Sequence, residues 1–74
     1  MTKVALVVSD VTVNGYSGVV GTLVSARTGR PMIRGLGKVQ TCIHGASPYA
    51  RATMLAAAGR LAMAMGYELV EAAS

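Results

Sequence analysis

One segment, HGASPYARATMLAAAGRLAMAMG at residues 44–66, limits the folds open to this chain more than any other. Ser47 is a good helix N-cap, and Pro48 suits the first helical position because its φ is already close to the helical value. Gly66 is typical of the position just past a helix C-terminus. These signals predict one helix between Ser47 and Gly66, and the rest of the chain must supply the surface on which it packs.

The apolar residues of this helix repeat at helical spacing. The stripe predicted to face the core consists of Met54, Leu55, Ala58, Leu61, Ala62 and Met65. The opposite side holds Tyr49, Ala52, Thr53, Ala56, Gly59, Arg60 and Met63, where Arg60 is the only charged residue. Such a strip would be an unusual apolar patch if it were left in water. We therefore expect Ala52, Ala56, Gly59, Arg60 and Met63 to form an interface. A second copy across a two-fold axis is favoured over the alternative, docking of another partner.

The residues before the helix are typical of strands and turns. The predicted strands span residues 3–13, 16–26 and 32–44, and residues 67–72 (YELVEA) permit a short fourth strand. Asn14-Gly15 between the first two strands is a strong hairpin signal, since both residues tolerate positive φ. Gly35 and Gly37 weaken the third strand, which is typical of a bulged edge strand. We expect an α+β fold: a three-stranded antiparallel sheet (βββα, possibly with a short fourth strand) with one helix packed on one face.

The size and the cysteine content restrict how such a fold is stabilised. We expect one domain over residues 1–74, and a domain this small buries a modest share of its surface. Cys42 is the only cysteine, which excludes a disulfide within the chain and a cysteine-rich metal site. With 53% apolar residues, a well-packed core or a second subunit is expected, and we favour a homodimer. No segment has the ~18 apolar residues of a membrane span, and the N-terminal apolar run is too short for a signal peptide. The expected location is the cytoplasm, without a membrane partner.

The positive charges are concentrated in one part of the chain. The net charge is +4, from seven Lys and Arg against three Asp and Glu. Arg27 and Arg30 lie in the second turn, and Arg34 and Lys38 lie on the strand that leaves it. Antiparallel pairing would bring Lys3 to the same end of the sheet. Arginine forks suit phosphates and carboxylates, so these five residues are the predicted partner-binding patch. The alternative is a solvated hairpin that protects an edge strand from aggregation.

Other candidate sites have ordinary structural explanations. Cys42 and His44 lie on the same face of a strand, but no second pair of ligands is available for a metal. We interpret them as a packed thiol and a capping or solvent-facing imidazole, with a contact of Cys42 across a dimer axis as the alternative. Asp10 is interpreted as a solvent-facing acid at a strand end, with a lone ligand or a salt-bridge partner of a basic residue as the alternatives. No serine has the spacing of a catalytic triad, and no metal or cofactor is expected.

The order of elements, with VVSD, NGYSGVVGTLV, YARATMLAAAGRLAMAMG and YELV, resembles the first half of a ribonuclease H-like fold. In that family a carboxylate cluster holds two metal ions. The resemblance places Asp10 at the first carboxylate, but Thr53 stands where the family has a helical glutamate. It therefore implies a half-domain without the catalytic residues, similar to the partial ribonuclease H module of HicB-type antitoxins. The acidic, glycine-rich strand motif of those antitoxins is absent.

A second resemblance is weaker. Residues 44–66 are also similar to the end of a double-stranded-RNA-binding domain, where a third strand leads into an alanine-rich helix. Ser47, Pro48, Tyr49 and Arg51 stand where that family carries a phosphate-binding lysine cluster. Together these observations predict a non-enzymatic interaction protein that acts as a homodimer and binds, occludes or regulates a partner macromolecule. A protein partner is favoured, and a nucleic-acid-binding module that uses the basic end of the sheet is the alternative.

Overall fold

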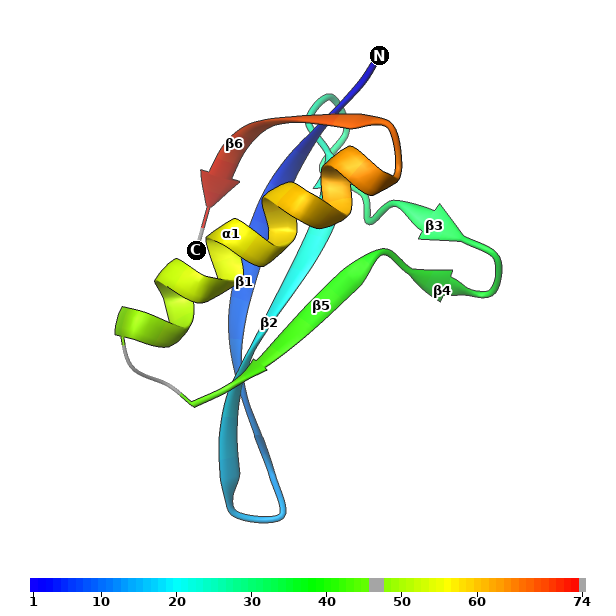
Figure 1. The fold of residues 1–74 in the computed structure, drawn as a ribbon. Helices are drawn as coiled ribbons and strands as arrows, with labels where there is room; N and C mark the ends of the chain where they lie inside the picture. The colour runs from blue at the N-terminus through cyan, green and yellow to red at the C-terminus, as the bar shows by residue number, and fades with distance from the viewer. Residues whose placement is uncertain (46–47, 74) are drawn as a thin grey trace.

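The computed structural model describes residues 1–45 and 48–73, with the backbone alone for residues 48–49 and 71–73. The fold is α+β, with one helix across one face of a curled, mixed sheet (Figure 1). The four strands of the sheet are β1 (Thr2–Val13), β2 (Tyr16–Ser25), β5 (Gln40–His44) and β6 (Tyr67–Ala73), in the order β5-β2-β1-β6. Strands β3 (Ile33–Arg34) and β4 (Gly37–Lys38) form a separate small hairpin, and the helix α1 spans Pro48–Ala64.

The hairpin β1–β2 follows the sequence prediction. Asn14 and Gly15 both have positive φ, 51° and 81°, as a tight two-residue turn requires. The antiparallel register runs from Val13 opposite Tyr16 to Val4 opposite Ser25. Because side chains alternate along a strand, Val4 and Leu6 face the helix and are buried, whereas Val7 on the opposite face is 38% exposed.

The third strand differs from the prediction of one bulged strand over residues 32–44. Met32 and Val39 lie side by side next to Leu23: the Met32 N–H donates to Leu23 O, and the Leu23 N–H donates to Val39 O, both at 2.9 Å. The six residues between them leave the sheet as the hairpin β3–β4, with Gly35 in its turn at φ 64°. The two glycines that were expected to form a bulge therefore belong to an inserted hairpin (Figure 1).

The sheet has a fourth strand, so it is neither three-stranded nor wholly antiparallel. Strand β6 pairs with β1 in parallel, from Thr2 beside Tyr67, with a bulge between Val4 and Ala5. Helix α1 makes this arrangement possible because it returns the chain across the sheet before β6 begins. The sequence signal YELVEA marked the strand correctly, while its partner and direction depend on where the helix places it.

The core lies between α1 and the inner face of the sheet. Its helical members are Ala50, Met54, Ala58 and Ala62, which pack against Val4, Leu6, Val19, Leu23 and Val39. Leu61 and Met65 are partly buried against this cluster, as predicted. Leu55 is 48% exposed, so its predicted place in the core is wrong. A helix turns by about 100° per residue, and with Met54 at the centre of the contact Leu55 points away from the sheet.

The helix ends as predicted. The Met65 N–H donates to the carbonyls of Leu61 and Ala62 at 3.1 Å, and Gly66 follows with φ 75°. The predicted N-cap, Ser47, lies outside the described residues.

Candidate interaction surfaces

Lys3 and Arg27 lie together at one end of the sheet, as predicted. The N–H of Ala26 donates to the carbonyl of Lys3 at 3.1 Å, which joins the start of β1 to the turn after β2. Both side chains line a hollow of about 440 Å³ with Thr2, Ser25 and Ala26. Glu68 lies beside Lys3 in the β1–β6 register and offsets part of its charge.

Ser25, which the sequence reading did not single out, organises the turn that carries Arg27 and Arg30. Its Oγ accepts the N–H of Arg27 and of Thr28 at 3.3 Å, and its carbonyl accepts the Gly29 N–H at 2.8 Å. The Ser25 N–H donates to the carbonyl of Arg30 at 2.8 Å, which closes the turn. The turn therefore presents two exposed arginines from a backbone that Ser25 holds through four hydrogen bonds.

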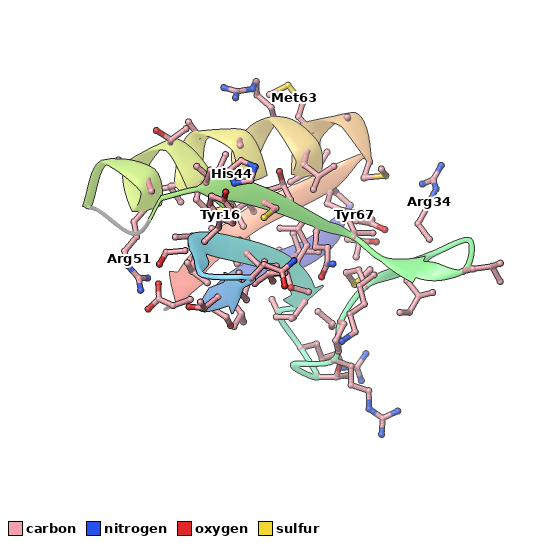
Figure 2. The ribbon with its side chains drawn as sticks, turned by 90° about the horizontal axis from the view of Figure 1, so that it is seen from below. Tyr16, Arg34, His44, Arg51, Met63 and Tyr67 are labelled. Atoms are coloured by element: carbon pink, nitrogen blue, oxygen red, sulfur yellow. The ribbon has the colours of Figure 1, made fainter. Side chains whose placement is uncertain are left out.

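The other two members of the predicted patch lie elsewhere. Arg34 and Lys38 belong to the hairpin β3–β4 and not to a strand of the main sheet, which corrects their predicted position. Figure 2 shows Arg34 on this hairpin, which projects beyond the body of the molecule. Ile33 is 61% exposed and Leu36 at the turn is fully exposed, so the hairpin combines two cations with apolar side chains. The sequence GLG at residues 35–37 is the signal that could have marked this tip.

No ion pair neutralises the five cations where both side chains are described. Within that part of the chain the salt bridge present joins Arg51 to Asp10, with 3.0 Å between Nη2 and Oδ2. Asp10 is exposed as predicted, but it lies within β1 and not at a strand end, and it has the salt-bridge role that was one of its alternative interpretations, with a partner on α1. Thr53 lies two residues further along the same helix, at the position where the ribonuclease H resemblance would require an acid.

The outer face of α1 is apolar and open. Ala52, Ala56 and Arg60 are exposed, and Gly59 is half-buried. Met63 is 80% exposed, and Figure 2 shows it on the side of α1 that faces away from the sheet. Leu55, which was assigned to the core, adds its side chain to this surface. The structure therefore brings together the five residues of the predicted interface and enlarges their apolar area.

The second face of the sheet has no helix over it, and sequence reasoning did not identify it as a surface. Tyr16 and Val13 are 76% and 63% exposed there. Together with Val11, Ser17, Gly18, Cys42 and His44 they line a small pocket of about 90 Å³. Cys42 is exposed, so its expected packing in the core is wrong, whereas His44 is solvent-facing as predicted.

Among the described residues, no three His, Cys, Asp or Glu side chains lie close enough together to hold a metal ion. No helix within the described residues is long and apolar enough to cross a membrane. Comparisons of the chain with protein-family models, with curated proteins and with solved structures found no match.

Proposed function

We propose that this chain is a non-enzymatic interaction protein that forms a homodimer through the outer face of α1. The observation that carries the proposal is the exposure of Leu55 and Met63 on a helix face where Arg60 is the only charge. Soluble monomers rarely leave such a patch in water. A patch that packs on its own copy closes the assembly at two subunits.

Side-chain size supports helix-on-helix packing. Ala52, Ala56 and Gly59 recur at spacings of three and four residues, so they form a row of small groups along the helix. Small side chains let the ridge of a second helix come close, while Met63 at the end of this row and Leu55 beside it provide apolar contacts. Arg60 lies at the rim in this arrangement, where its charged end stays in water while its methylene groups cover apolar surface.

The proposed action is to bind a partner macromolecule and so occlude or regulate it. Two features favour binding over catalysis: the single carboxylate that the ribonuclease H resemblance assigns, Asp10, is paired with Arg51, and Thr53 replaces the helical acid. A compact dimer with exposed arginines on the turn and on the projecting hairpin fits an acidic partner surface. We favour a protein partner, as for the partial ribonuclease H module of antitoxins that the chain resembles.

Light scattering tests the dimer. The wild type is expected to have about twice the 7.6 kDa mass of one chain or more at micromolar concentration, and Ala56→Glu is expected to reduce it. Thr12→Glu is a matched control, because it adds the same charge at an exposed position on β1. A wild-type monomer, or an Ala56→Glu variant of unchanged mass, would contradict the helix-mediated dimer.

A nucleic-acid-binding module is the second candidate, and the basic end of the sheet favours it. Lys3 and Arg27 share one hollow, and Arg34 and Lys38 extend the positive surface onto the hairpin. Contacts with phosphates release counterions, so binding would weaken steeply as salt rises. A gel-shift experiment with duplex DNA and RNA at low and moderate salt tests this candidate. Absence of binding at low salt would exclude it.

A further inference from the structure

Strand β5 forms one edge of the sheet, and within residues 1–45 and 48–73 no other strand pairs with its outer backbone groups. The Leu23 N–H donates to the Val39 carbonyl at 2.9 Å, and the Gly45 N–H donates to the Ser17 carbonyl at 3.0 Å. The backbone groups of residues 39 and 45 thus bond toward β2. In an antiparallel ladder, every second residue of a strand bonds to one neighbour and the residues between them point to the other side. The N–H and C=O groups of Gln40, Cys42 and His44 therefore point away from the sheet.

The two edges of the sheet differ in how they are protected. Edge strands normally carry charges, prolines or bulges that prevent pairing with other chains. Strand β6 has the exposed Glu68 and a bulge in its pairing with β1. Strand β5, with the sequence QTCIH, has no Lys, Arg, Asp or Glu, no proline and an unbroken register with β2. The β6 edge is therefore protected against pairing with another chain, and the β5 edge is not.

We propose that β5 pairs in antiparallel fashion with β5 of a second copy, about a two-fold axis at Cys42. This register sets Cys42 opposite Cys42 of the second copy and Gln40 opposite His44, so all three residues with open backbone groups are used. The result is one continuous eight-stranded sheet. The interface is separate from the outer face of α1 and does not depend on it.

A second copy fits this edge better than a foreign strand because the edge is complementary to itself. Its exposed side chains are a thiol, an amide and an imidazole, so pairing sets no like charges of Lys, Arg, Asp or Glu against each other. The amide of Gln40 and the imidazole of the opposite His44 are a donor and acceptor pair. Thr41 and Ile43 keep their positions toward α1, since Ile43 packs against the core.

The neighbouring chain leaves this segment accessible. The hairpin β3–β4 departs from the sheet just before Gln40, and Gly45 after His44 donates its N–H to Ser17 on β2. Figure 1 shows β5 at the edge of the sheet, with β2 on its inner side.

The thiol of Cys42 allows this pairing to be detected by chemical cross-linking. The two Cα atoms of a directly opposed, hydrogen-bonded pair lie about 5.5 Å apart, within the span of a short bis-maleimide. The wild type is expected to give a cross-linked dimer in high yield. Cys42→Ser/Val13→Cys, which moves the thiol to an exposed site on β1, is expected to give a yield at least tenfold lower. Equal yields from the two proteins would overturn the proposal.

The same interface can be tested by measuring the assembly mass of variants that add charge to the β5 edge. Cys42→Lys sets two ammonium groups against each other on the axis, whereas Cys42→Ser is the neutral control. Ala56→Glu is expected to remain a dimer through β5, and Ala56→Glu/Cys42→Lys is expected to be a monomer. Gln40→Lys replaces Cys42→Lys in this series if thermal unfolding shows that the latter does not fold.

The masses separate this proposal from the helix-mediated dimer. If both interfaces exist, the wild type is a tetramer or larger, and each single variant is a dimer. If the wild type is a dimer and Ala56→Glu is a monomer, the edge pairing is wrong and the helix dimer stands. If Ala56→Glu remains a dimer that Cys42→Lys dissociates, the edge pairing stands. A monomeric wild type overturns the pairing with a second copy. This holds even if β5 is found to accept a strand of another protein.

Discussion

Arg51 on α1 holds Asp10 on β1 through one guanidinium nitrogen: Nη2 lies 3.1 Å from Oδ1 and 3.0 Å from Oδ2. The two residues are 41 positions apart, and their side chains are 41% and 64% exposed. This contact joins the start of the helix to the middle of the β1–β2 hairpin. The carboxylate of Asp10 therefore takes part in a structural contact on the surface.

We expect the ion pair to add little to stability. Asp10→Asn and Arg51→Gln should each lower the free energy of unfolding by about 1 kcal/mol or less, because water and salt screen exposed pairs. Urea denaturation of both variants and of the double variant gives the coupling energy. A coupling well above this range that persists in molar salt would show that the pair is not screened as its exposure implies.

We expect no metal-dependent nuclease activity. A two-metal site needs several carboxylates, and Asp10 is paired with Arg51 while Thr53 occupies the helical position of the ribonuclease H resemblance. Incubation with DNA and RNA in Mg²⁺ or Mn²⁺ tests this expectation, with Asp10→Ala as the control for contaminating nucleases. Cleavage by the wild type that disappears in the variant would contradict it.

Gly21 and Gly59 should respond in opposite ways to alanine. A Cβ at Gly21 would lie 2.5 Å from Met54 Sδ and 2.9 Å from Leu6 Cδ1, so Gly21→Ala should destabilise the fold by about 1–3 kcal/mol. A Cβ at Gly59 meets nothing within 4 Å of its own chain, so in the Ala56→Glu background, where the helix-mediated dimer is absent, Gly59→Ala should stabilise the fold by about 0.5–1 kcal/mol. Thermal unfolding at fixed protein concentration measures both, and a stabilising Gly21→Ala would contradict the close packing of α1 on β2.

Charge reversal in the basic patch should weaken binding and leave the fold intact. Arg30 lies in the turn after β2 and Arg34 on the projecting hairpin, so Arg30→Glu and Arg34→Glu probe the two parts separately. If the ligand is a duplex oligonucleotide, loss of each phosphate contact should reduce the salt dependence of binding by about one counterion. Circular dichroism checks the fold, and Thr12→Glu controls for added charge. Unchanged affinity in both variants would mean that these arginines are only a solvated surface and not a binding site.

Much of the fold follows from local signals. Asn14-Gly15 specifies the first hairpin because few other dipeptides accept positive φ at both positions. Gly66 ends the helix for the same conformational reason, and the alternation of apolar residues in β1 and β2 determines which side chains can face a helix. Each of these features depends on residues close together in the chain, and the sequence was sufficient to predict them.

Other features depend on contacts between distant residues. Leu55 is as apolar as a core residue. It is exposed because α1 is rotated about its own axis so that Met54, and not Leu55, packs against Gly21 on the sheet. The sequence did not reveal that residues 33–38 leave the sheet. They do so because backbone hydrogen bonds hold Met32 and Val39 next to each other beside Leu23, which is distant from them in the chain. The position of β5 at an unguarded edge is likewise a property of strand order.

Local sequence signals account for the alternation of side chains along the strands, the positive-φ turn at Asn14-Gly15, the end of the helix and the concentration of positive charge. The folded arrangement determines which charges lie together, which apolar residues stay in water and which strand forms an edge. Backbone conformation and side-chain alternation depend on neighbouring residues, whereas burial and backbone pairing depend on which distant segments the fold places against each residue.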